Sequence, residues 1–157
     1  MSTPNPDYTD QGVVLSLTGD GSGTYVDKAG VSHNNGTLTT TYVAGTTFQC
    51  GRSSDFAAWV VTGFSAATSI TVKIELQRVD ANNPSLFSGW FPVQSERSDQ
   101  VGVVAFEHTI LPADLSSIRL LTKESRLSGN CRISAKAAGA GLTAADLVYV
   151  GVNALPR

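Results

Sequence analysis

The chain has 157 residues and a net charge of −2, and it is 41% hydrophobic but only 15% charged. This length fits one domain with its own core, and the charged share is well below the roughly 25% of typical soluble domains. The 11 basic and 13 acidic residues form no basic cluster, which disfavours nucleic-acid binding. No run of 18 apolar residues occurs, so we expect no membrane span.

Serine and threonine supply the polarity that charged residues usually provide. The chain holds 17 serines and 16 threonines. A hydroxyl group that finds a partner is much cheaper to bury than an ion, so such a surface favours packing against neighbours in an assembly. Threonine is also common in β strands, and this simpler interpretation fits the composition equally well.

The N-terminal segment differs from the rest of the chain. Residues 1–11 include two prolines, two aspartates and almost no apolar side chains, which predicts a flexible arm. The arm has neither the basic nor the apolar region of a signal peptide, so we expect none. We therefore divide the chain into an arm over 1–11 and one domain over 12–157.

Alternating apolar and polar residues predict β strands along most of the domain. The pattern is clearest over 70–77, which reads ITVKIELQ, and it returns over 131–137, which reads CRISAKA. In chain order, strands are expected at 13–17, 25–26, 36–43, 57–62, 70–77, 90–93, 101–108, 118–122, 131–137 and 147–152. Short strands separated by Gly-, Asn-, Pro- and Ser-rich breaks predict an all-β fold, an antiparallel, jelly-roll-like β-sandwich of about 8–10 strands.

Several connections have turn signals of their own. Small residues at 128–130 predict a hairpin that makes the strands at 118–122 and 131–137 antiparallel neighbours. The three glycines of 19–23 predict a turn and not a phosphate loop, because a strand pattern follows where a phosphate loop needs a helix. Single helical turns are expected at 112–115 and 143–146.

Catalytic and metal-binding patterns are missing from the sequence. His33 and His108 share no ligand spacing with the cysteines, and each is expected at the surface or at a strand edge. No Gly-x-Ser-x-Gly motif is found, so we predict no enzyme, no metal and no cofactor. Without an export signal, Cys50 and Cys131 are expected as reduced core residues.

Aromatic residues give the remaining functional signal. Phe87, Trp90 and Phe91 lie beside a turn, where we expect Trp90 or Phe91 to fill the core, although an exposed ring there would contact a sugar or a protein. Tyr25 and Tyr42 are further candidates for such contacts. Trp59, in the apolar run 56–61, is expected in the core.

The order of four segments resembles β-sandwich structural proteins of tailed bacteriophages. These segments are 69–78, which contains ITVKIE, then GWFPVQS at 89–95 and RISAKA at 132–137, with EHT at 107–109 before the last, and the likeness extends over about 56–153. The resemblance implies a non-enzymatic subunit of the virion, of the capsid-decoration, neck or tail accessory type. It also implies a homo-oligomer made in the host cytoplasm that contacts other virion proteins. No functional residue carries over, because the matching positions are framework strands.

One alternative function stays open from the residues themselves. A carbohydrate-binding or adhesin-like module would use Trp90, Phe91, Tyr25 or Tyr42 as a stacking platform.

Overall fold

The computed structural model describes residues 10–26, 29–50, 55–78, 89–122 and 129–155. These ranges contain strands and turns, and none of their segments is a helix long and apolar enough to cross a membrane. The strands are β1 (Asp10–Thr18), β2 (Tyr25–Val26), β3 (Ser32–His33), β4 (Val43–Ala44), β5 (Phe48–Cys50), β6 (Asp55–Gly63), β7 (Ser69–Arg78), β8 (Gly89–Val93), β9 (Ser95–Arg97), β10 (Val104–Ala105), β11 (Glu107–Ile110), β12 (Ser117–Thr122), β13 (Gly129–Ala138) and β14 (Leu147–Leu155).

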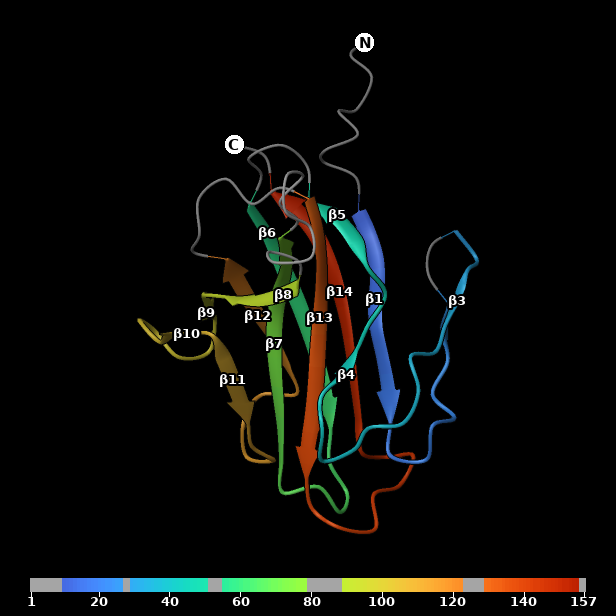
Figure 1. The fold of residues 1–157 in the computed structure, drawn as a ribbon. Helices are drawn as coiled ribbons and strands as arrows, with labels where there is room; N and C mark the ends of the chain where they lie inside the picture. The colour runs from blue at the N-terminus through green and yellow to red at the C-terminus, as the bar shows by residue number, and fades with distance from the viewer. Residues whose placement is uncertain (1–9, 27–28, 51–54, 79–88, 123–128, 156–157) are drawn as a thin grey trace.

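Two antiparallel sheets pack face to face, which confirms the predicted all-β sandwich (Figure 1). The first sheet has the order β1-β14-β6-β12-β9-β10. The second, in front in Figure 1, has the order β11-β7-β13-β4, with β8 beside β7 and β5 also paired with β13. The short strands β2 and β3 pair with each other.

The core lies between the sheets and follows the alternation of the sequence. On β7, the side chains of Ile70, Val72 and Ile74 are fully buried, while the residues between them face away from the first sheet. Burying each such side chain contributes roughly 1.5–3 kcal/mol. The alternation in the sequence therefore predicted the inward face of β7 correctly.

The same alternation shows that the prediction for Trp59 was wrong. Ala58 and Val60 on β6 are inward and buried, and Trp59 between them is 44% exposed. Successive side chains of a strand point to opposite faces, so burying both neighbours turns the tryptophan outward. The unbroken apolar run around Trp59 concealed this alternation in the sequence.

The predicted hairpin between the strands at 118–122 and 131–137 was also wrong. β12 pairs with β6 and β9 in the first sheet, whereas β13 pairs with β7, β4 and β5 in the second. Both strands direct alternate apolar residues to the same core from opposite sides. A crossover between sheets therefore gives the same local pattern as a hairpin.

Two predicted strands are broken in the structure. Within 36–43, only an isolated bridge between Thr37 and Thr18 and the start of β4 have strand pairing. The predicted strand at 101–108 begins as a turn and continues as β10, and β11 then begins at Glu107 in the other sheet. The chain changes sheets at this point, so a single face of alternating residues cannot stay buried.

The helical turns expected at 112–115 and 143–146 are non-helical turns closed by an aspartate. The Asp114 carboxylate accepts a hydrogen bond from the Leu111 amide at 2.8 Å. The Asp146 carboxylate accepts one from the Thr143 amide, also at 2.8 Å. A side chain that bonds its own turn in this way competes with helix formation.

One side of the sandwich is closed by a short backbone segment. The amide of Gly45 donates to the carbonyl of Ile133 on β13 at 2.8 Å, and the amide of Thr46 donates to the carbonyl of Val14 on β1 at 2.7 Å. The segment therefore joins the second sheet to the first.

The opposite side is joined by buried polar side chains of β9 and β11. His108 Nε2 lies 2.8 Å from Ser95 Oγ, and Arg97 donates to the Thr109 carbonyl at 2.8 Å. Arg97 also forms ion pairs with Asp99 at 2.8 Å and Asp114 at 3.3 Å. These contacts connect the two sheets where β10 and β11 form their edges.

One of the two histidines, His108, is more buried than predicted. His108 is 3% exposed and therefore not at the surface, because alternation turns it toward Ser95. Burial lowers the pKa of His108, which keeps its ring neutral at pH 7. His33 lies half-buried on β3, opposite Tyr25, and β3 pairs with β2 in a sheet of two strands, which agrees with the predicted strand edge.

Cys131 faces the core as predicted, but the prediction of a reduced thiol was wrong. The residue is buried and disulfide-bonded. The only other cysteine in the sequence is Cys50, at the end of β5, whose backbone pairs with Gly129 of β13. This pairing joins segments about 80 positions apart, which the spacing of the cysteines does not reveal.

The predicted arm lies mostly outside the described residues. Asp10, within the predicted 1–11 range, already begins β1 and pairs with Asn153 of β14.

Candidate functional surfaces

The aromatic residues named from the sequence are placed on different surfaces. Phe87 lies outside the described residues. On β8, Trp90 is half-buried beneath the guanidinium of Arg132, 4.3 Å from the ring centroid, and Phe91 is 46% exposed. The residue of β8 that enters the core is Val93. The expectation that Trp90 or Phe91 fills the core was therefore wrong.

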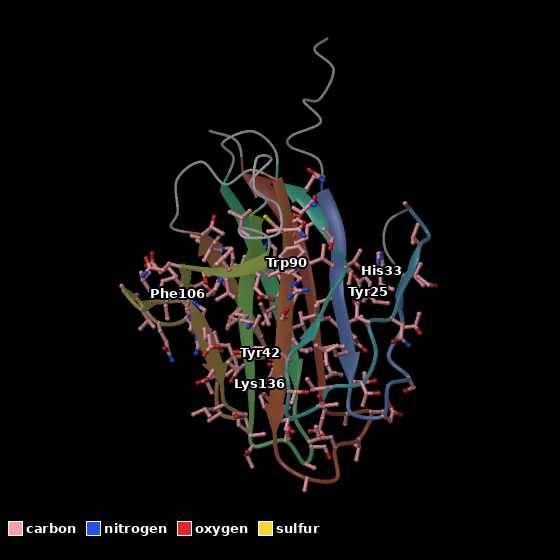
Figure 2. The ribbon with its side chains drawn as sticks, viewed as in Figure 1. Tyr25, His33, Tyr42, Trp90, Phe106 and Lys136 are labelled. Carbon is pink, nitrogen blue, oxygen red and sulfur yellow. The ribbon has the colours of Figure 1, made fainter. Side chains whose placement is uncertain are left out.

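Tyr25 lies on the opposite side of the molecule from Tyr42 and Trp90. Its ring centroid is 5.9 Å from that of Tyr149, on the outer side of the first sheet. Tyr42 and Trp90 lie in front of the second sheet, as Figure 2 shows. The aromatic candidates therefore do not form one stacking platform.

The outward side chains of β7 and β13 form a face that we call the polar face. Its residues are Thr71, Lys73, Glu75, Arg132, Ser134 and Lys136. The strand register places Thr71 beside Lys136, and Glu75 beside Arg132. The sequence pattern predicted a polar side for both strands, but it could not supply these pairs.

Glu75 is the central carboxylate of the polar face and is only 4% exposed. It accepts hydrogen bonds from Ser134 Oγ at 2.6 Å and from Arg132 Nε at 3.1 Å, and Lys73 Nζ lies 3.6 Å away. Burial alone would raise the pKa of Glu75, but these partners lower it overall. The carboxylate is therefore ionised and fully engaged, which does not suit a general acid or base.

Tyr42 contacts both lysines of the polar face. Lys73 Nζ lies 4.0 Å and Lys136 Nζ 4.7 Å from its ring centroid, and its hydroxyl donates to Glu107 Oε1 at 2.7 Å. Burial and Glu107 raise the pKa of Tyr42 far above the physiological range. Its hydroxyl is therefore no nucleophile, and its ring holds the two ammonium groups in place.

A pocket of about 260 Å³ lies beside Lys136. It is lined by Thr40, Ser69, Thr71, Lys136 and residues 137–139. Within the described residues Lys136 forms no ion pair. Sequence reasoning missed this pocket because its lining comes from three separate segments.

The side formed by 101–115 exposes large apolar side chains, and we call it the apolar rim. Val101 is 96% and Leu115 64% exposed. The other members are Val103, Val104, Phe106 and Leu111. Figure 2 shows Phe106 on this side, away from Tyr42. A single strand over 101–108, as expected from the sequence, does not predict these exposed apolar side chains.

The described residues offer no evident catalytic centre. No three of their His, Cys, Asp or Glu side chains gather to hold a metal ion. Ser95 and His108 are in hydrogen-bond contact but fully buried, so a substrate cannot reach the hydroxyl.

The chain is thus an antiparallel β-sandwich with a polar face and an apolar rim. Comparisons with protein-family models, with curated proteins and with solved structures found no match to it.

Proposed function

We propose that this protein is a non-enzymatic structural subunit of a phage particle, of the capsid-decoration, neck or tail accessory type. The observation that supports a role in assembly is the apolar rim, where the exposed side chains of Val101 and Leu115 and four others come from one stretch of the chain, because exposed apolar surface often marks protein–protein contacts. The phage assignment rests on the resemblance of 70–75, 89–95 and 132–137 to virion β-sandwich proteins.

The proposed partner at the rim is a second copy of the chain, in a homo-oligomer. Both sheets end here, at β10 and β11, and exposed strand edges readily pair with other chains. The carboxylates of the rim are already engaged, since Glu107 accepts from Tyr42 and Asp114 accepts from Arg97. Two copies would therefore meet with little like-charge repulsion, which matches the depletion of free charge at interface cores. Contacts with other virion proteins would use the remaining surface.

The test is the mass of the full chain in solution, measured by light scattering over a range of concentrations. The proposal expects a defined oligomer that a Val101→Ser/Leu115→Ser variant dissociates. Val26→Ser is the matched control, because Val26 is also exposed but lies on β2, away from the rim. A wild-type chain that stays monomeric, and that is absent from every isolated particle, would refute the proposal.

The carbohydrate-binding alternative, as an aromatic platform, has less support. Tyr25 contacts Tyr149 on the outer side of the first sheet, whereas Tyr42 and Trp90 lie on the outer side of the second, so no row of rings is available for a glycan chain.

A further inference from the structure

We propose that the pocket beside Lys136 binds a carboxylate carried on a small polyhydroxylated ring, which is the chemistry of an acidic sugar residue. The proposal is independent of assembly at the apolar rim, because the pocket lies on the polar face of the second sheet.

Three chain segments bring hydroxyl groups around one ammonium group. Thr71 of β7 is the register partner of Lys136 on β13, and two residues further along the same strands Ser69 is the partner of Ala138. Thr40 comes from the segment before β4, which is tied to β13 by a 2.8 Å bond from the Ala137 amide to the Thr39 carbonyl. The hydroxyls are therefore positioned by backbone pairing.

On the polar face, Lys73 and Arg132 share the carboxylate of Glu75, and Lys136 forms no ion pair within the described residues. Lys73 and Lys136 contact the same tyrosine ring, but in the part of the chain that the structure describes only Lys73 of the two forms an ion pair, with Glu75 at 3.6 Å. The other nearby carboxylate, Glu107, is bonded to the Tyr42 hydroxyl. A ligand carboxylate at Lys136 would supply the missing charge in a charge-assisted hydrogen bond. Contact with the ring restricts the lysine beforehand, which reduces the entropy lost on binding.

The size and lining of the pocket favour a sugar ring over a bare anion. Its volume of about 260 Å³ is slightly below that of most small-ligand sites, which limits the ligand to a single ring. Serine and threonine hydroxyls both donate and accept hydrogen bonds, as ring hydroxyls do. The Thr71 hydroxyl is also bonded to that of Thr109 at 3.0 Å, so its orientation is restricted.

The test is a titration of the full isotope-labelled chain, followed by amide NMR, with D-glucuronate as the probe. We expect saturable shifts at the amides of Thr71, Lys136 and Ala138, and at least about tenfold weaker binding of the neutral match, D-glucose. Lys136→Gln should weaken glucuronate binding about tenfold or more, because it removes a charged hydrogen bond. Arg119→Gln is the matched control, since it removes one positive charge from the other sheet.

Two results would overturn the proposal: no saturable shift with glucuronate, or unchanged binding in Lys136→Gln. Acetate that binds as tightly as glucuronate would overturn the sugar assignment and indicate an adventitious anion only. If Lys136→Gln does not fold, Lys136→Met makes the same test, because it keeps an unbranched stem beside the Tyr42 ring.

Discussion

Replacing Asp146 with asparagine should destabilise the fold more than the same replacement of an exposed aspartate in another turn. Asp146 is completely buried. Its Oδ1 accepts hydrogen bonds from the amides of Ser65, Ala66 and Ala67 at 2.6, 2.9 and 2.8 Å, and its Oδ2 accepts one from Thr143 at 2.8 Å. One carboxylate thus fastens the loop after β6 to the turn before β14.

The size of the stability loss follows from the pKa shift of Asp146 and from the carboxylate oxygen that asparagine lacks. Burial alone would raise the pKa of Asp146, but the backbone amides lower it from 3.8 to about 2. At about 1.4 kcal/mol per unit, this shift corresponds to about 2.5 kcal/mol of stability at neutral pH. In the Asp146→Asn variant an NH₂ group would replace one of the two acceptor oxygens, leaving a buried amide unpaired at a cost of about 1–3 kcal/mol. The two effects overlap, because the protonated carboxyl that defines the pKa shift has also lost one acceptor oxygen, so we expect a total loss of roughly 2–3 kcal/mol.

The stability difference between the wild type and Asp146→Asn should depend on pH. Because the folded-state pKa lies below the unfolded value of 3.8, the stabilisation is complete above 3.8 and disappears as the pH falls toward 2. Urea unfolding followed by circular dichroism at pH 7 and at pH 3 measures both effects. The wild type should lose part of its advantage over Asp146→Asn at pH 3. The exposed Asp20→Asn is the control, with a much smaller effect. A variant as stable as the wild type at pH 7, or an equal gap at both pH values, would refute the reasoning.

Four further substitutions test other parts of the structure by the same unfolding measurement. Arg97→Met leaves the buried Asp99 without its ion pair and should cost about 3–5 kcal/mol, and a loss below about 1 kcal/mol would contradict the role given to this pair. Trp59→Ser should cost no more than about 1 kcal/mol at its exposed site, whereas Ile74→Ala in the core should cost about 2–5 kcal/mol; equal losses would place Trp59 in the core after all. Cys131→Ser removes a disulfide and should cost about 2–5 kcal/mol, and thiol labelling of the unfolded wild type that detects free cysteine would show that no disulfide was present.

The sequence predicted those features of the fold that depend on near neighbours in the chain. The strands at 70–77 and 131–137 were predicted within a few residues of β7 and β13, because their alternation is unbroken. The all-β sandwich followed from many such short patterns. Where an apolar run hid the alternation, as at Trp59, the inward face was chosen wrongly.

Features that depend on pairing between distant segments could not be predicted. The alternation of β12 and β13 is the same whether they form a hairpin or face each other across the core. His108 is buried because β11 lies against β9 of the other sheet, and this contact has no local signal. The disulfide of Cys131 likewise requires strand pairing that joins distant parts of the chain.

The candidate surfaces were predicted only in part. Tyr42 and Trp90 were singled out as possible contact residues, and both lie on the outer side of the second sheet. The pocket beside Lys136 depends on the path of 39–42 across β13, which the sequence does not specify. The apolar rim depends on the change of sheets between β10 and β11, which was not foreseen.

The most direct test of the central claim is the solution mass of the wild-type chain compared with that of Val101→Ser/Leu115→Ser. A symmetric oligomer of the wild type and a monomer of the variant, with Val26→Ser unchanged, is the predicted result. A wild-type mass equal to one chain at every concentration would contradict self-assembly through the apolar rim.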